Sequence, residues 1–265
     1  MDNRAIGVFD SGLGGLTVVR SILARQPDIN IVFFGDTLNM PYGEKTREQI
    51  TALALHDAEV LEQFDLAAMV IACNTADSAG GRQVAEHASV PVYGVIDVTA
   101  LAAVNATRNG KIGVAATRAT VRSRAYPKAI RKYLPEAEVY TRACPELVPL
   151  IEAGHLQKDD PEIIRILQKY IPALISKGID TLVLGCTHYP LIQETVAELF
   201  PEVTLISSSD AQAEAVLRQL PEDAGIRQAD RQFYVSSDPE FFARKADVFM
   251  GSGMNADIRL IASGK

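Results

Sequence analysis

Short apolar runs recur along the chain and alternate with longer stretches in which apolar residues have helical spacing. Most of the short runs are continuously apolar, as expected of parallel strands covered by helices on both faces. The stretch REQITALALHDAEVLEQF at residues 47–64 is one of the amphipathic segments between them. This alternation predicts an α/β fold of mainly parallel sheets flanked by helices, in which ligands bind at the carboxyl ends of the strands. The predicted strands are residues 5–9, 29–35, 66–72, 90–96, 111–116, 137–143, 181–185 and 203–208.

Two pairs of similar segments indicate an internal repeat. IGVFDSGLGG, which starts at residue 6, is similar to IGVAATRATV, which starts at residue 112. VIACNT and VLGCTH, which carry Cys73 and Cys186, follow in the same order at nearly the same separation. Chance similarity between two buried strands is the alternative. We interpret the repeat as two pseudo-symmetric α/β domains that face each other across an active-site cleft, with one cysteine from each.

The repeat also predicts where the domains begin and end. Residues 1–97 and 210–265 are expected to form the first domain, which carries Cys73. Residues 98–209 are expected to form the second domain, which carries Cys186. The chain beyond about residue 210 has a mostly helical pattern and is expected to pack back on the first half.

Charge and hydropathy limit the classes of function. The chain of 265 residues has a net charge of −7 at pH 7, and 48% of its residues are apolar. An acidic balance does not favour a nucleic-acid or anionic-membrane surface, so neither is an expected partner. No apolar run approaches the length of a membrane span, and the first residues lack the pattern of a secretory signal.

Three cysteines, Cys73, Cys144 and Cys186, lie far apart in the sequence. An odd number of separated cysteines argues against a disulfide framework and predicts a cytoplasmic protein. The four histidines are scattered, and no His/Cys spacing is typical of a metal site. The sequence therefore predicts neither a metal nor another cofactor.

Asp10 and Ser11 stand at the end of the first predicted strand, just before the glycines of FDSGLGG. Glycines permit close approach of the backbone to a ligand, and amides at a helix start favour an anion. The segment is not the GxGxxG fingerprint of dinucleotide-binding proteins. A generic strand-to-helix turn explains the glycines but not the Asp-Ser pair. A second turn, Pro41-Tyr42-Gly43, can place backbone groups against a ligand, although a purely structural turn is the default interpretation.

Cys73 and Cys186 each end a predicted strand and precede polar side chains. These are Asn74 and Thr75 after the first cysteine, and Thr187 and His188 after the second. Thiolate chemistry needs a nearby base or polar contacts, which His188 can supply for Cys186. A buried core thiol is the alternative interpretation of each cysteine.

Two further residues have less specific surroundings. Cys144 lacks comparable polar neighbours and is predicted to be structural. Glu152 lies in an apolar, helix-like segment. Its carboxylate either faces water or acts beside Cys186 or His188.

Taken together, these motifs resemble those of the aspartate/glutamate racemase superfamily, and within it the cofactor-independent glutamate racemases of bacterial cell-wall synthesis. The matching segments occur in family order from near the N-terminus to about residue 192. They are GVFDSGLGGLTV, GDT, PYGEKT, IACNTA, NGKIGV, SRAY, ACPELVPLIEAG and LGCTHYPL. The pairing of CNTA with GCTHYP is the most specific part of the resemblance.

The resemblance implies an isomerase that interconverts L- and D-glutamate without a cofactor and supplies D-glutamate for peptidoglycan. It implies that Cys73 and Cys186 are catalytic bases on opposite sides of the substrate. Asp10 is expected to assist Cys73, and Glu152 and His188 to assist Cys186. The implied substrate contacts are Asp10, Ser11, Tyr42, Gly43, Asn74, Thr75, Thr117, Thr120, Thr187 and His188.

The sequence departs from the family pattern near these motifs. Leu38 and Asn39 replace Ala and Arg in the family's GDTAR segment, and Asp77 follows CNTA where a small residue is usual. These departures leave open a racemase of aspartate or another amino acid. A non-catalytic, two-lobed protein that binds a small ligand is the alternative from another class. A homodimer is possible, but no interface can be located from the sequence.

Overall fold

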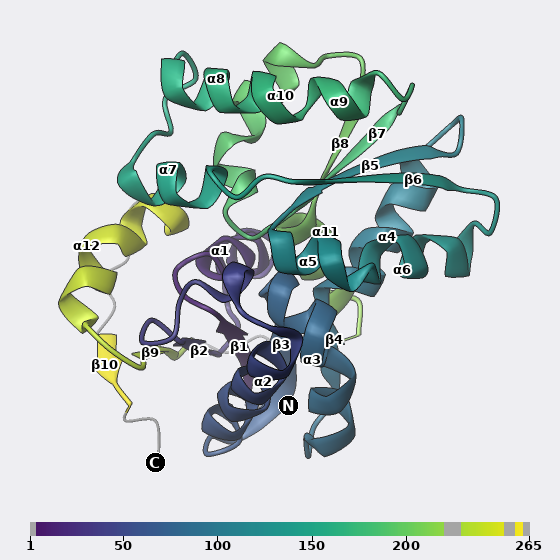
Figure 1. Ribbon diagram of the computed structural model, residues 1–265. Coiled ribbons are helices and arrows are strands. Elements are labelled where there is room, and N and C mark those ends of the chain that lie inside the picture. Colours follow the sequence, from purple (N-terminus) through teal and green to yellow (C-terminus); the bar gives the residue numbers. More distant parts are fainter. Residues whose placement is uncertain (1–3, 220–228, 252–257, 262–265) are drawn as a thin grey trace.

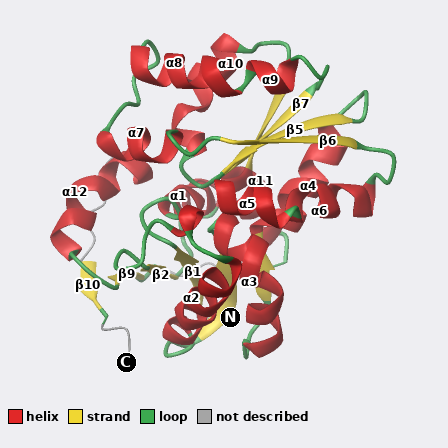
Figure 2. Cartoon of the chain, viewed as in Figure 1, coloured by secondary structure: helices red, strands yellow, loops and turns green. Residues whose placement is uncertain are grey.

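The computed structural model describes residues 4–219, 229–251 and 258–261, and its strands form two separate sheets (Figure 1; Figure 2). The strands are β1 (Ala5–Asp10), β2 (Ile31–Gly35), β3 (Leu66–Ile71), β4 (Val92–Gly94), β5 (Lys111–Ala116), β6 (Glu138–Ala143), β7 (Thr181–Gly185), β8 (Thr204–Ser207), β9 (Arg231–Val235) and β10 (Ile258–Leu260). The helices are α1 (Leu16–Arg25), α2 (Arg47–Leu61), α3 (Asn74–His87), α4 (Val95–Ala106), α5 (Arg118–Ser123), α6 (Ala125–Tyr133), α7 (Leu147–Ala153), α8 (Pro161–Tyr170), α9 (Pro172–Ile175), α10 (Gln193–Leu199), α11 (Ser208–Leu217) and α12 (Pro239–Met250). Two short 3₁₀ helices are η1 (Tyr42–Glu44) and η2 (Tyr189–Ile192).

Four strands of the first sheet, β2, β1, β3 and β4, repeat the topology of the second sheet. The first has the strand order β10-β9-β2-β1-β3-β4 and the second the order β6-β5-β7-β8. All of the neighbouring strands pair in parallel. β1 and β5 occupy equivalent places, as do β3 and β7, so the segments of the sequence repeat lie at matching positions. The predicted fold, two pseudo-symmetric α/β domains on parallel sheets, is confirmed.

Successive residues of the central strands enter different hydrophobic clusters. On β2, Phe33 packs into the cluster that includes residues of α1 and α12, and Phe34 into the cluster that includes residues of α2 and α3. On β7, Leu184 and Val183 likewise enter two different clusters. Alternate strand residues point to opposite faces, and helices cover both faces. This double coverage explains why the strands are continuously apolar in the sequence.

The last part of the chain differs from the prediction. It packs on the first domain, as expected, but it is not mostly helical, because β9 pairs with β2 and β10 pairs with β9. β9 lies near the edge of the sheet, where only Phe233 and Val235 are fully buried, and β10 has three residues. Such short, partly polar strands leave little apolar signal in the sequence. The predictions for residues 220–228, 252–257 and 262–265 lie outside the described residues.

The apolar run at 90–96 forms a shorter strand than predicted. β4 ends at Gly94 and α4 starts at Val95. The carboxylate of Asp77, on α3, accepts a hydrogen bond of 2.7 Å from the amide of Ile96, in the first turn of α4. A Cβ atom at Gly94 would lie 2.5 Å from Oδ1 of Asp77. Asp77 therefore caps this helix from the side, which the local apolar pattern could not indicate.

The two domains are joined by a pair of helices. The chain leaves the first sheet through α4 and leaves the second sheet through α11, and these helices pack against each other. The predicted boundaries after residues 97 and 209 fall within α4 and α11, so the assignment of each helix to one domain stays a prediction. None of the helices in the described ranges is long and apolar enough to cross a membrane.

Candidate active site

A cavity of about 250 Å³ lies where the central strands of both sheets end. Ser11 follows β1, Cys73 lies just beyond β3, Thr117 follows β5 and Cys186 follows β7. This is the edge at which open parallel sheets bind ligands. The lining residues are Ser11, Gly12, Met40, Pro41, Tyr42, Gly43, Glu44, Cys73, Asn74, Thr75, Thr117, Arg118, Cys144, Pro145, Val148, Pro149, Glu152, Cys186, Thr187 and His188.

Cys73 is held at the start of α3. Its sulfur accepts a hydrogen bond from the amide of Ala76 at 3.4 Å and donates to Oγ of Ser11, also at 3.4 Å. Burial and, next, the negative charge of Asp10 raise the pKa of the Cys73 thiol to about 12. Cys73 is therefore a thiol at neutral pH, with two polar neighbours that can stabilise a transient thiolate.

Cys186 has a different electrostatic neighbour, His188. Nδ1 of His188 lies 3.9 Å from Sγ of Cys186, and Nε2 lies 3.0 Å from Oε1 of Glu152 on α7. Burial disfavours the charged ring, but the contacts with Cys186 and Glu152 outweigh burial and raise the pKa of His188 to about 10. An imidazolium at this position stabilises negative charge on the sulfur of Cys186. One thiol thus lies near an anion and the other beside a cation.

The backbone amides of the FDSGLGG turn were expected to bind an anionic ligand. In the structure the side chain of Asp10 bonds to this turn. Its carboxylate accepts hydrogen bonds from the amide of Gly12 at 3.0 Å and from Oγ1 of Thr187 at 3.3 Å. Burial raises the pKa of Asp10, although the nearby His188 opposes this shift. The amides of the turn are therefore engaged with the protein's own carboxylate.

The glycine turn also brings the two domains into contact. A Cβ atom at Gly14 would lie 2.1 Å from Oγ1 of Thr187 and 2.6 Å from Nδ1 of His188. The backbone carbonyl of Thr187 accepts a hydrogen bond of 2.8 Å from Oγ1 of Thr17. Close packing against the Cys186 loop thus requires glycine at position 14.

Three threonine hydroxyls form a cluster across the domain interface. Oγ1 of Thr75 lies 2.9 Å from Oγ1 of Thr117 and 3.2 Å from Oγ1 of Thr120, and the last two lie 3.0 Å apart. Thr75 and Thr117 line the cavity, whereas Thr120 does not. Thr120 therefore lies behind the two threonines that face the cavity.

Asn74 and Tyr42, two of the expected substrate contacts, form side-chain hydrogen bonds with other residues of the protein. Oδ1 of Asn74 accepts a hydrogen bond of 2.5 Å from Tyr126, and Nδ2 of Asn74 donates to Oγ of Ser208 at 3.3 Å. The hydroxyl of Tyr42 points to two carboxyl groups, those of Asp36 and Asp57. The hydroxyl of Tyr42 is therefore engaged within the protein, although Tyr42 itself lines the cavity.

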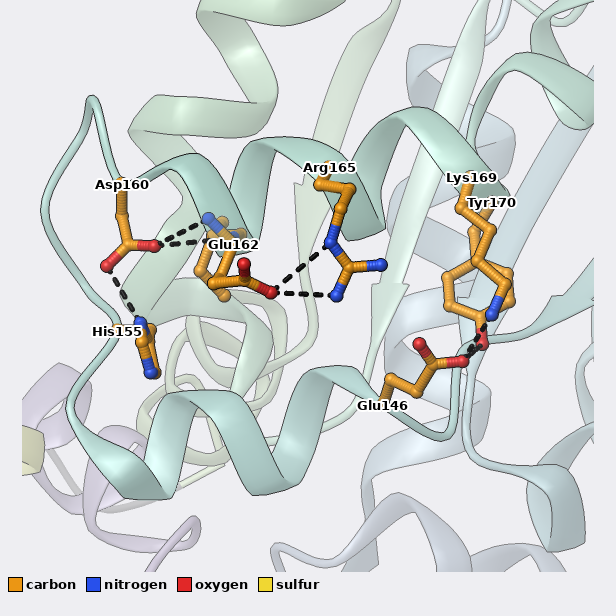
Figure 3. Close-up of polar contacts among 8 residues, drawn as sticks. Glu146, His155, Asp160, Glu162, Arg165, Lys169 and Tyr170 are labelled. Carbon is orange, nitrogen blue, oxygen red and sulfur yellow. Dashed lines mark hydrogen bonds and ion pairs between the residues drawn. The ribbon is translucent and has the colours of Figure 1, made fainter.

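Glu152 lies on α7. Side chains at both ends of α7 form polar contacts with residues of α8 or its cap (Figure 3). At the start of α7, Glu146 accepts hydrogen bonds from Lys169 at 2.5 Å and Tyr170 at 2.7 Å. Just beyond α7, Nδ1 of His155 lies 2.9 Å from Oδ2 of Asp160, the residue that caps α8. These contacts fix the position of the helix that carries Glu152.

Two residues of α12 contact the Glu152–His188 pair, and neither was predicted from the sequence. Nζ of Lys245 donates to the backbone carbonyl of Glu152 at 3.0 Å. The ring of Phe249 meets the ring of His188 edge to face, with centroids 5.2 Å apart. α12 thus extends from the first domain to α7 of the second (Figure 1). No sequence signal marks these contacts, because they join residues far apart in the chain.

A further ion pair joins the domains at the edge of the cavity. Nη1 of Arg118, on α5, lies 3.1 Å from each carboxylate oxygen of Glu44, on η1. Both side chains are about half exposed, so the pair contributes little to stability. It places one positive and one negative charge at the cavity wall.

Cys144 lies in the cavity wall, as the other two cysteines do. Its side chain is fully buried, and its sulfur donates only a long contact of 3.6 Å to the carbonyl of Arg142. Burial raises the pKa of the Cys144 thiol to about 12. It has no partner comparable to His188 or Ser11, and its structural role stays a prediction. Within the described ranges, no group of three or more His, Cys, Asp or Glu side chains is placed to hold a metal.

The three departures from the family pattern lie away from the cavity wall. The side chain of Leu38 is 58% exposed. Nδ2 of Asn39 donates to Oδ1 of Asp36 at 3.1 Å, and Asp77 caps α4. None of the three is among the lining residues.

Comparison with known proteins gives a consistent assignment. The Asp/Glu/hydantoin racemase family model matches residues 16–216. A curated glutamate racemase from Neisseria gonorrhoeae is 42% identical over 267 residues, which cover 98% of this chain and 97% of that protein. The crystal structure of glutamate racemase from Francisella tularensis in complex with D-glutamate superposes with a TM-score of 0.91 at 34% identity, covering 99% of both chains. A glutamate racemase structure from Bacillus anthracis gives a TM-score of 0.89 at 32% identity, covering 98% of both chains. The chain therefore belongs to the Asp/Glu/hydantoin racemase family.

Proposed function

We propose that this protein interconverts L- and D-glutamate without a cofactor, and that Cys73 and Cys186 are its two bases. The observation that carries the proposal is the arrangement of these thiols, which follow equivalent strands of two similar domains and line one cavity. The family relatives named glutamate racemase support the choice of substrate.

The electrostatics of the site suggest which thiol begins as the base. Cys186 lies beside the His188 imidazolium, which can stabilise a thiolate there, whereas Cys73 near Asp10 retains its proton. The resemblance to glutamate racemases implies that Cys186 faces the Cα–H of L-glutamate, so Cys186 then removes this proton while Cys73 delivers its own proton to the opposite face. The Cα–H bond broken at one face is replaced by one formed at the other, and the negative charge passes to Cys73. Reaction of D-glutamate follows the same steps in reverse.

The reaction needs more than two bases, because a Cα–H group is a far weaker acid than a thiol. A gap on the order of ten pKa units corresponds to about 14 kcal/mol. Preorganised donors in a partly enclosed site supply such stabilisation by acting on the developing carbanion. Ser11, Thr75 and Thr117 offer neutral hydroxyl donors at the cavity wall. These hydroxyls can rotate to donate to a substrate carboxylate.

The cellular role, the compartment and the oligomeric state of the protein are also proposals. We infer that the product serves peptidoglycan synthesis, and that the enzyme acts in the cytoplasm. The three free cysteines suit a reducing compartment. A homodimer is retained as a prediction.

The experiment that tests the proposed function follows optical activity of L-glutamate, D-glutamate and L-aspartate with purified protein and no added cofactor. Both glutamate isomers are expected to lose optical activity, and L-aspartate to keep most of it. Because Leu38, Asn39 and Asp77 lie outside the cavity wall, they give no reason to expect a different substrate. Turnover of aspartate alone would contradict the choice of glutamate, and binding without turnover would indicate a ligand-binding protein.

A further inference from the structure

Next to the Pro41–Gly43 turn, the side-chain oxygen atoms of Asp36, Tyr42 and Asp57 form a row of short contacts. The hydroxyl oxygen of Tyr42 lies 2.6 Å from Oδ2 of Asp36 and 2.8 Å from Oδ2 of Asp57. Asp36 follows β2, Tyr42 begins η1, and Asp57 lies on α2. Neither carboxyl group is exposed to solvent, and Tyr42 is 1% exposed. Pro41, Tyr42 and Gly43 of this turn line the cavity.

Counting protons shows that this row cannot contain two carboxylates. A phenol has one proton and can donate to only one of its two neighbours. If both carboxyl groups were ionised, the second short contact would join two acceptor oxygens without a proton between them. Burial, ahead of the neighbouring acidic groups, raises the pKa of Tyr42, so the phenol keeps its proton. One carboxyl group must therefore carry a proton and donate it to the phenol oxygen.

The remaining contacts identify which carboxyl group is protonated. Oδ1 of Asp36 accepts hydrogen bonds from Ser236 at 2.7 Å and from Asn39 at 3.1 Å, as a carboxylate does. Oδ1 of Asp57 is buried and has no hydrogen-bond partner among the described residues. An ionised oxygen with no donor is costly in a protein interior, whereas a neutral acid tolerates this position better. Burial, the charge of Asp36 and the more distant charge of Asp10 also raise the pKa of Asp57.

We propose that Asp57 is a neutral acid that donates to Tyr42, that Tyr42 donates to the carboxylate of Asp36, and that this directed row positions the Pro41–Gly43 turn at the substrate cavity. Asp36 and Asp57 are then positioning residues, since neither lines the cavity. The row also ties the turn to the end of β9, through the hydrogen bond from Ser236 to Asp36. The kinetic part of this inference rests on the proposed racemase activity, whereas the proton assignment does not.

Infrared spectroscopy of protein containing isotope-labelled aspartate tests the proton assignment at neutral pH. The wild type is expected to show the carbonyl stretch of a protonated carboxylic acid, and Asp57→Asn to lose it. Asp10 is another buried carboxyl group, so the assignment depends on the loss in this particular variant. Asp65→Asn, at an exposed position, is the matched control and should keep the band. A band that persists unchanged in Asp57→Asn would overturn the assignment.

A second variant covers the case in which Asp57→Asn does not fold. Tyr42→Phe removes the acceptor of the Asp57 proton, so the same band should shift to higher frequency. An unshifted band in Tyr42→Phe would contradict donation to the phenol.

Steady-state kinetics test the positioning role. Tyr42→Phe is expected to raise KM for glutamate about tenfold and to change kcat less, because charge-assisted hydrogen bonds that hold the turn are lost. Asp57→Asn, which keeps a neutral donor, should raise KM less than Asp57→Leu, which has none. Equal KM values for wild type, Tyr42→Phe and Asp57→Leu would overturn the positioning role. Absence of racemisation in the wild type would instead contradict the proposed function, and the infrared result would still decide the proton assignment.

Discussion

His188 lies 3.0 Å from Glu152 through Nε2, while Nδ1 of the same ring faces the sulfur of Cys186 at 3.9 Å. The buried ring therefore connects a carboxylate to a thiol. Its raised pKa, about 10, makes it a cation under the conditions in which the thiol would act. The charge state of Cys186 in the proposed mechanism depends on this connection.

Glu152→Gln is expected to shift the alkaline limb of the pH profile to lower pH. The substitution removes one of the contacts that raise the pKa of His188, so the imidazolium is lost at lower pH. Measurement of kcat/KM from neutral pH to about 10 checks this shift. Because L- and D-glutamate have equal free energies in achiral solution, kcat/KM must fall equally in both directions. Glu162→Gln, on α8 and bonded to Arg165, is the control and should leave the profile unchanged.

Loss of either proposed base should abolish racemisation. Cys73→Ala and Cys186→Ala are each expected to lower kcat by at least about 10⁴-fold, the upper part of the range for general acid–base catalysis. Cys144→Ala removes a third buried thiol from the same cavity wall and is expected to retain turnover. Chiral chromatography of the products measures all three variants. Near-normal turnover in Cys73→Ala or Cys186→Ala would end the two-thiol account.

Lys245→Met tests whether α12 supports the Glu152–His188 pair. The substitution keeps most of the apolar stem but removes the hydrogen bond to the carbonyl of Glu152. One neutral-acceptor bond contributes up to about 1.5 kcal/mol, so kcat/KM is expected to fall by up to about tenfold. If Lys245 acts through His188, the alkaline limb of the kcat/KM profile should shift to lower pH in the same variant. Arg244→Met, at an exposed position of the same helix, should change neither quantity.

Asp77 is expected to make the protein less stable as pH rises from about 4 to 6. Burial raises the pKa of Asp77 to about 6 from 3.8, so the native state binds more protons than the unfolded state in this window. The free energy of unfolding therefore decreases by at most about 3 kcal/mol as pH rises through it. Asp77→Asn keeps an acceptor for the Ile96 amide and should remove this part of the pH dependence.

Urea unfolding of wild type and Asp77→Asn at both ends of the window measures the difference. Asp28→Asn, at an exposed position, is the control and should follow the wild type. If the free energy of unfolding of the wild type and of Asp77→Asn changed equally with pH, this result would contradict the raised pKa of Asp77.

Local patterns were enough to predict the central strands and the polar residues that follow them. β1, β3, β5 and β7 are largely apolar, and at or just beyond their ends lie Asp10, Cys73, Thr117 and Cys186. Parallel pairing then brings these ends to one edge of each sheet, so the cavity follows from the order of the elements.

Contacts between distant segments were not predictable from such patterns. Ser236 and Asp36 meet across 200 residues, and Lys245 reaches Glu152 across 93. Tyr42 lines the cavity, but its hydroxyl points to Asp36 and Asp57 because tertiary packing decides which way a side chain faces. β9 and β10, which lie next to and at the edge of the sheet, were missed because they are short and partly polar.

The most direct test of two bases on opposite faces is racemisation of L-glutamate in heavy water, with the two enantiomers separated at early times. The account predicts that the D-glutamate formed carries deuterium at Cα, because Cys73 delivers a proton exchanged with solvent, while the remaining L-glutamate keeps its hydrogen. Deuterium that enters the remaining L-glutamate as fast as the product, or D-glutamate that retains the original hydrogen, would contradict it.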